Sequence, residues 1–145
     1  MNAQEQAMTA AINAARAARG VGALRGDERL AAAAREHAED MAAHPGLGHT
    51  GSDGSDGGQR IRRAGYVWTR WAEATGWGYD TGPMVAWWMQ SPQHAPLLLD
   101  AGLTDIGAGY AAGGQNGNSW VVCLATGDAA AHDTTYMPIV LGGGG

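Results

Sequence analysis

"TDIGAGYAAGGQNGNSWVVCLATG", residues 104–127, is the stretch that decides the fold class. Its two ends, 104–113 and 119–127, flank the segment "GQNGN", which is a strong signal for a tight β-hairpin turn. The pattern predicts two neighbouring strands that pair antiparallel. No strand–helix–strand crossover is needed elsewhere in the chain, which indicates an α+β domain and not a doubly wound parallel sheet.

The chain before this hairpin carries mostly helical patterns. Apolar spacing and the helix start and stop signals predict helices over 4–19, 27–43, 57–64 and 82–90, and a strand over part of 66–75. Asp27 is placed to cap the second helix or to serve as an acid in its first turn, and Thr81 is placed to cap the last helix. His37 falls on the apolar face of the second helix, so we expect it to be a core histidine with its polar atoms satisfied.

The length of 145 residues suits one domain with one core. We expect this domain to cover 1–127 and to be followed by a tail over 128–145 that is partly disordered. No apolar run approaches the roughly 20 residues that a membrane-spanning helix needs. Residues 1–20 lack the pattern of a signal peptide, so we expect a cytoplasmic protein or one from which a leader was removed.

Charge and cysteine content narrow the function further. The net charge of −5 argues against nucleic acid as a partner, because phosphate binding needs a basic face. Arg60, Arg62 and Arg63 form a basic cluster, which we expect on a solvated helix face. The single cysteine, Cys123, cannot form an intrachain disulfide, and its apolar surroundings predict a buried, inert thiol.

Four stretches together resemble the CAP superfamily, the SCP-domain proteins that include cysteine-rich secretory proteins, antigen 5 and pathogenesis-related proteins. They are "INAARAARGVGAL", "LAAAAREHAEDMAA", "GHTGSDGSDGGQRIRRAGY" and "WWMQSPQHAPLLLDAGLTDIGAGYA". The resemblance runs from about residue 8 to 127 and is closest to the bacterial branch. It implies an α-β-α sandwich, in which a small antiparallel sheet is flanked by helices, and a family whose members are usually secreted.

The resemblance also implies a central cleft that holds two histidines and acidic residues. Carried over by motif, the histidines are His49 in "GHT" and His94 in "SPQH", and the acid is Glu73 in "WAEAT". Ser91 stands at the position of a second acid, and Asp105 in "TDIG" stands where bacterial members often have Glu. The neighbours differ from the family pattern, which predicts a more apolar and stiffer cleft at these positions: Ala72, Ala74, Gln93, Ala95 and Pro96.

Two imidazoles and one carboxylate are a ligand set for zinc, with water in the fourth position. The spacing of His49, Glu73 and His94 along the chain carries no metal signal of its own. The resemblance alone implies that these three residues lie together. We therefore expect a cleft that binds zinc or another divalent metal through these three residues, together with a small-molecule or lipid-like ligand.

Two alternatives remain open at this level. In the first, the protein is an enzyme that uses a histidine oriented by a carboxylate as a general base in acid–base or hydrolytic chemistry, with Ser91 and Asp105 among the candidate groups. In the second, it is a non-catalytic module for a lipid-like or aromatic ligand, contacted by Trp71 and Trp88. Trp71 precedes Glu73 by two residues, so both should point to the same face of a strand, whereas Trp88 also matches a family core position.

Overall fold

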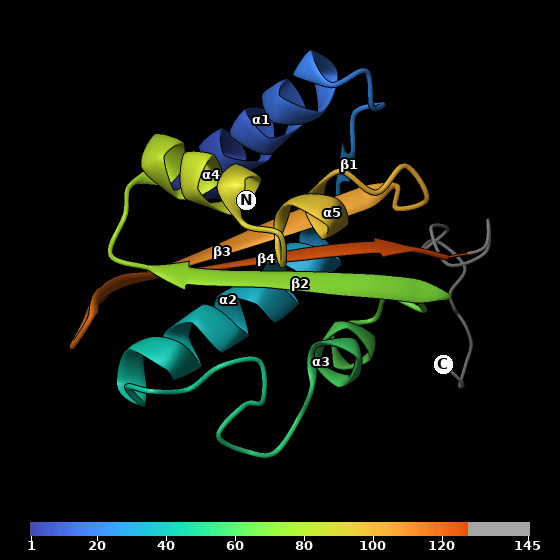
Figure 1. Cartoon of the computed structure of the whole chain (residues 1–145). Coiled ribbons are helices and arrows are strands. Elements are labelled where there is room, and N and C mark those ends of the chain that lie inside the picture. Colours follow the sequence, from blue (N-terminus) through green and yellow to red (C-terminus); the bar gives the residue numbers. More distant parts are fainter. Residues whose placement is uncertain (128–145) are drawn as a thin grey trace.

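The structure is a computed structural model that describes residues 1–127 (Figure 1). A four-stranded sheet in the order β1-β3-β4-β2 forms its centre. Its strands are β1 (Arg25–Gly26), β2 (Arg70–Trp77), β3 (Asp105–Gly114) and β4 (Gly117–Thr126). The helices are α1 (Ala3–Ala18), α2 (Glu28–Ala43), α3 (Gly57–Arg63), α4 (Thr81–Gln90) and α5 (Ala95–Leu98). The tail predicted over 128–145 lies outside the described residues.

The predicted hairpin is present as β3 and β4, which pair antiparallel around Gln115 and Asn116. Gly117 has a φ of 91°, a backbone conformation that a residue with a Cβ atom rarely adopts. β4 also pairs antiparallel with β2, so β2 is an edge strand. The sheet differs from the purely antiparallel expectation in one place, since β1 runs parallel to β3. β1 has only two residues, too few to show a strand period in the sequence.

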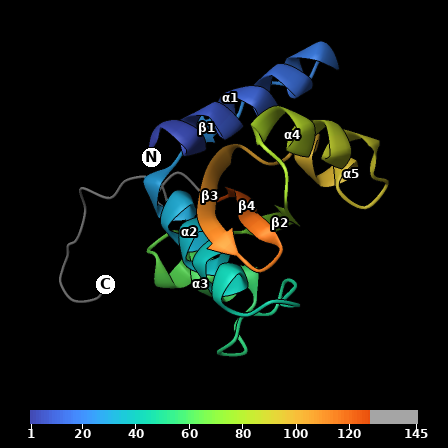
Figure 2. The ribbon, with the colours of Figure 1, turned by 90° about the vertical axis from the view of Figure 1, so that its left-hand side faces the viewer.

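The helices cover both faces of the sheet, which confirms the predicted α-β-α sandwich. α1, α4 and α5 lie on one face, and α2 and α3 lie on the other (Figures 1 and 2). Each face has its own apolar core. Val122 and Leu124 of β4 enter the first core, whereas Val121 and Cys123 enter the second. The continuous apolar run "WVVCLA" follows from this central position, because both faces of β4 are buried.

Local capping explains where the long helices begin. The Asn2 side chain accepts a hydrogen bond from the Glu5 N–H, and the Glu5 carboxylate accepts one from the Asn2 N–H, which makes a capping box for α1. Asp27 caps α2, as predicted. The cap expected for α4 was wrong by one residue, because Asp80 occupies that position and Thr81 is the first helical residue. No helix within residues 1–127 combines the length and apolar character required to cross a membrane.

Two glycines of β3 let α2 rest directly on the sheet. A Cβ atom on Gly107 would lie 2.0 Å from the backbone nitrogen of Ala31, and one on Gly109 would lie 2.2 Å from that of Arg35. Glycine within a strand often marks such a close approach of another backbone. This contact fixes the height of α2 above the sheet, and therefore the starting point of the loop that carries His49.

Candidate functional site

His49 and His94 come from separate loops and line one cavity of about 440 Å³. His49 lies between α2 and α3, and His94 immediately precedes α5. Between them the cavity is bordered by the end of β2, at Thr75, Gly76 and Trp77. The two histidines carried over from the family motifs therefore share a cleft across the edge strand of the sheet.

Glu73 lies on β2 and is almost fully buried behind His49. Its Oε1 atom is 2.9 Å from His49 Nδ1, and its Oε2 atom accepts a hydrogen bond of 2.7 Å from Arg60 Nη2. A buried carboxylate requires such partners, because the loss of hydration would otherwise favour the neutral acid. Both oxygens of Glu73 are thus occupied by protein groups.

Arg60 belongs to the candidate site, where the sequence interpretation did not place it. It was predicted on a solvated face with Arg62 and Arg63, but it is 2% exposed while the other two are exposed. Besides Glu73, its guanidinium donates to the carbonyl oxygens of His49 at 2.9 Å and of Ser55 at 2.8 Å. Arg60 therefore joins the loop before α3 to β2. The signal in the sequence was the need of a buried Glu73 for a cationic partner.

The loop that carries His49 is held from a second side by His37. This side chain is fully buried, as expected of a core histidine, and its Nε2 atom lies 2.7 Å from the carbonyl oxygen of Gly48. Its Nδ1 atom, however, has no hydrogen-bond partner in the described part of the chain, so the expectation that both polar atoms would be satisfied holds for one of them. The backbone next to His49 is nevertheless fixed before any ligand binds.

His94 is held by its own turn. Its Nδ1 atom lies 2.7 Å from Ser91 Oγ, and the Ser91 carbonyl oxygen accepts a hydrogen bond from the His94 N–H at 3.1 Å. The ring of Trp87 packs against the imidazole at a centroid distance of 5.4 Å. Ser91 therefore has a positioning role toward His94 in this structure.

The two imidazoles have opposite electrostatic environments. The hydrogen bond to Glu73 raises the pKa of His49, while the positive charge of Arg60 opposes this increase. Loss of hydration lowers the pKa of His94, and the charge of His49 lowers it further. As the pH falls from neutral, His49 gains a proton before His94 does.

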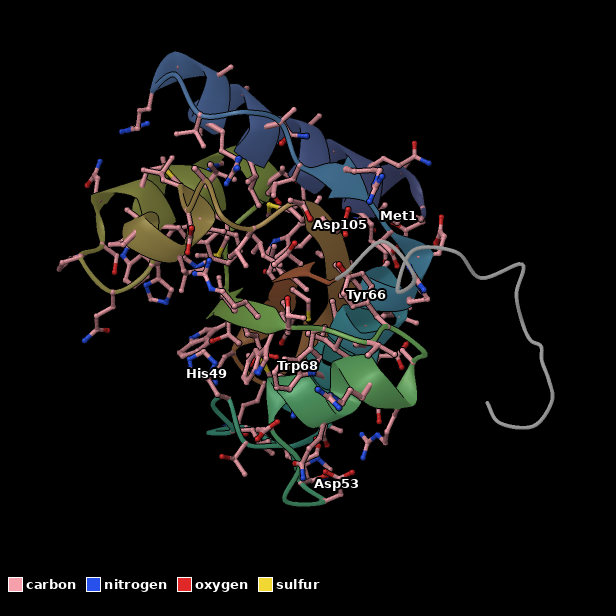
Figure 3. The ribbon with its side chains drawn as sticks, turned by 90° about the vertical axis from the view of Figure 1, so that its right-hand side faces the viewer. Met1, His49, Asp53, Tyr66, Trp68 and Asp105 are labelled. Carbon is pink, nitrogen blue, oxygen red and sulfur yellow. The ribbon has the colours of Figure 1, made fainter. Side chains whose placement is uncertain are left out.

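The remaining predicted residues lie outside the cleft. Asp105 is buried at the start of β3, where it accepts hydrogen bonds from Tyr66 Oη at 2.5 Å and from Arg25 Nε at 2.9 Å. Figure 3 shows Tyr66 and Asp105 apart from His49. Asp105 does not line the cavity, because its carboxylate is turned to the network that joins β1 and β3.

Neither of the tryptophans expected to contact a ligand lines the cavity. Trp88 is fully buried in the core between α4 and the sheet, and its Nε1 atom donates to the Thr75 carbonyl oxygen at 3.0 Å. Trp71 shares the α3-facing side of β2 with Glu73, as expected, but it packs edge-on against Trp68 with a centroid distance of 6.2 Å. The aromatic residues of the cavity are instead Trp77, Tyr79 and Trp87.

Two imidazoles line the cleft, whereas Glu73 is buried behind His49 with both of its oxygens engaged. Among residues 1–127 no group of three or more His, Cys, Asp and Glu side chains is placed to hold a metal ion. In the same part of the chain, the Nε2 atoms of His49 and His94 have no hydrogen-bond partner, whereas both Nδ1 atoms are occupied. Nε2 is therefore the nitrogen that each ring offers to a ligand.

Comparison with known proteins agrees with this architecture. The model of the family described as "CAP: Cysteine-rich secretory protein family" matches residues 9–125. An outer surface protein of Borrelia burgdorferi is 22% identical, with a TM-score of 0.74 over 83% of this chain and 90% of that one. An extracellular SCP-domain protein of Bacillus anthracis is 20% identical, with a TM-score of 0.74 over 84% of this chain.

Chain coverage and sequence identity determine what these matches show about the chain. This chain spans 40% of the Bacillus anthracis protein. Venom allergen-like protein 4 of Schistosoma mansoni is 12% identical, with a TM-score of 0.65 over 89% of this chain and 92% of that one. No curated protein matches the chain in sequence. At these low identities the solved structures show a shared fold alone, and the family match is the finding that classifies the chain.

Proposed function

The chain belongs to the CAP family, the cysteine-rich secretory protein family, and on that premise we propose that its cleft binds a divalent metal ion of the zinc type together with a small ligand. The observation that carries the proposal is that His49 and His94 line one cavity and both have their Nδ1 atoms engaged. When the proton of each neutral ring is on Nδ1, the Nε2 lone pair is free for a metal. Imidazole nitrogen is a preferred ligand of zinc.

The proposal assigns Glu73 a supporting role. Metal-bound histidines commonly donate their second N–H to a carboxylate, which fixes the ring and makes the ligating nitrogen more basic. The His49–Glu73 contact of 2.9 Å has this arrangement. Arg60 occupies the other Glu73 oxygen, so the carboxylate stays in place without a metal. A bound zinc ion would act as a Lewis acid toward an oxygen of the small ligand.

Metal binding should depend on pH through His49. In the metal-free protein we expect zinc to bind at about pH 7.5 and to bind much more weakly at about pH 5.5, because a ligand imidazole must be neutral. The sign follows from the raised pKa of His49, since protons compete with the metal as the pH falls through that pKa. Calorimetric titration of zinc into EDTA-stripped and dialysed protein at both pH values would measure this difference.

Matched histidine variants separate this site from surface binding. His49→Ala and His94→Ala should each weaken zinc binding by at least about tenfold, whereas His44→Ala should leave it unchanged. His44 is exposed at the end of α2 and interacts with Asp40, outside the cavity. Equal zinc affinity in the wild type and in both cleft variants would contradict the proposal.

Acid–base chemistry is a second candidate, favoured by the opposite pKa shifts of His49 and His94. Two titratable groups in one cleft whose pKa values are pushed apart can supply an acid and a base at the same pH. If they do so, hydrolysis of chromogenic ester or peptide substrates in EDTA should give a bell-shaped pH profile, and His94→Gln should lower its rate by about 100-fold. A rate that is independent of His94, or that appears only with added metal, would exclude this candidate.

A further inference from the structure

Exposed aromatic side chains gather at one place in this molecule. Within residues 1–127 the large hydrophobic side chains that remain exposed are Val67, Trp77, Tyr79 and Trp87. Trp77, Tyr79 and Trp87 are 49%, 44% and 48% exposed, and all three line the cavity that contains His49 and His94. We call these three residues the aromatic platform. An apolar surface that stays in solvent and is gathered at a cleft marks a binding site.

Each ring of the aromatic platform is carried by a fixed element. Trp77 ends β2, where it pairs with Ser119 of β4. The carbonyl oxygen of Tyr79 accepts hydrogen bonds from Asn118 Nδ2 at 2.7 Å and from Trp120 Nε1 at 2.9 Å. Trp87 lies on α4 and packs against the His94 ring. A ligand therefore meets a surface that is largely formed in advance, which lowers the entropic cost of binding.

The residues around the aromatic platform select a chemical class of ligand. None of the described residues that line this cavity is Asp, Glu, Lys or Arg, and none is Leu, Ile or Val. No permanently charged side chain in this lining could pair with a charged ligand, and Met84 alone is too small an aliphatic surface to enclose a fatty acyl chain. Flat aromatic faces, together with Thr75 and the two histidines in the same lining, instead match a pyranose ring. Such a ring has an apolar C–H face and a rim of hydroxyl groups.

A second cavity continues the cleft beyond Trp77. It has a volume of about 140 Å³, and Gly48 and Trp77 line both cavities. Gln115 and Asn116 of the hairpin turn lie along it. Amide side chains can donate and accept hydrogen bonds with sugar hydroxyl or N-acetyl groups. One sugar ring on each side of Trp77 would occupy both cavities, so the site suits an oligosaccharide better than a single sugar.

We propose that the aromatic platform binds a neutral oligosaccharide across Trp77, with one ring beside His49 and His94. This inference deepens the proposed function by naming the class of its small ligand. The proposed contacts with the sugar are made by side chains of the cavity lining, so oligosaccharide binding does not require a metal. The two proposals can therefore succeed or fail separately.

Calorimetry on the EDTA-treated full chain tests the inference with four neutral tetrasaccharides: cellotetraose, N-acetylchitotetraose, maltotetraose and xylotetraose. We expect at least one to bind, and Trp77→Ala and Trp87→Ala each to lower its affinity by about tenfold. Val67→Ala is the matched control, because Val67 is exposed but does not line the cavity. The Val67→Ala variant should bind the tetrasaccharide with wild-type affinity. Circular dichroism establishes that each variant is folded.

Further measurements separate the competing outcomes. Trp77→Ala should retain zinc binding while it loses oligosaccharide affinity, and this variant separates the two proposals. Failure of all four tetrasaccharides to bind the folded wild type would overturn the inference. Equal affinity in Trp77→Ala and the wild type would also overturn it. Binding of decanoate, without any tetrasaccharide, would assign the cleft to acyl chains.

Discussion

Replacing Gly107 with alanine is expected to destabilise the domain by about 3 kcal/mol, a large part of the roughly 5–15 kcal/mol that holds a domain of this kind together. The new Cβ atom would lie 2.0 Å from the backbone nitrogen of Ala31 and 2.3 Å from the carbonyl carbon of Leu30. Both are backbone atoms of α2, and they cannot turn aside as a flexible side chain could. The helix would have to lift from the sheet and open the core that Leu30 and Ala34 share with β4.

Urea unfolding followed by circular dichroism measures this loss, and Gly82→Ala is its matched control. Gly82 lies in α4, and a Cβ atom there would meet open space. Because alanine favours a helix more than glycine does, this control should change stability by about 1 kcal/mol or less, in the stabilising direction. If Gly107→Ala changed the free energy of unfolding by no more than Gly82→Ala does, the direct contact between α2 and β3 would be contradicted.

Replacing Arg60 with methionine is expected to cost about 3–5 kcal/mol of folding stability, since it leaves Glu73 buried without its cationic partner. The guanidinium is 2% exposed, and it also satisfies the carbonyl oxygens of His49 and Ser55. Methionine keeps much of the volume of the side chain, so the loss reports the charge and the hydrogen bonds. The same urea titration measures it.

Two comparisons make this expectation specific. Arg62→Met, on the exposed side of the same helix, removes a guanidinium 4.2 Å from the Trp68 ring and should cost about 1 kcal/mol or less. The double variant Arg60→Met with Glu73→Leu should be more stable than Arg60→Met, because it removes the unpaired charge. A double variant less stable than the single one would contradict the buried ion pair.

The pKa of His49 provides an independent test of the same arrangement. The charge of Arg60 lowers this pKa, so in metal-free Arg60→Met it should rise above the wild-type value. In Glu73→Gln it should fall, because the hydrogen-bonded carboxylate that raises it is gone. Titration of the imidazole protons by NMR distinguishes the two directions. A pKa that is the same in both variants would mean that His49 does not sense Glu73 or Arg60.

The hairpin and the long helices were predictable because their signals are local. The Asn-Gly turn lies between its own strands, and Asp27 lies directly before the helix that it caps. Short elements were harder to predict. β1 has two residues and depends on β3, which follows it by about eighty positions, and α5 has four residues with Pro96 in its first turn. Segments of this length are shorter than the periods on which sequence patterns rest.

The site shows the same division between local and tertiary information. Motifs alone pointed to His49, Glu73 and His94, whose neighbours in the chain form recognisable runs. For Arg60 the sequence indicated only that a buried Glu73 needs a cationic partner, because which of the three arginines is buried depends on which side of α3 faces β2. The aromatic residues that line the cavity differ from the predicted ones for a related reason. Trp87 and Trp88 are adjacent in the chain, yet on a helix they point in directions about 100° apart.

The sequence by itself determined the α+β class, the family, the long elements and which two histidines line the cavity, because these depend on periodicity, turn chemistry and motif. The tertiary structure alone decided that both oxygens of Glu73 belong to His49 and Arg60, and that Trp77 and Trp87 face the cleft in place of Trp71 and Trp88. Hydrogen-bond partners and solvent exposure depend on which surfaces meet when the sandwich closes. These contacts form between segments that are distant in the chain, so no single segment predicts them.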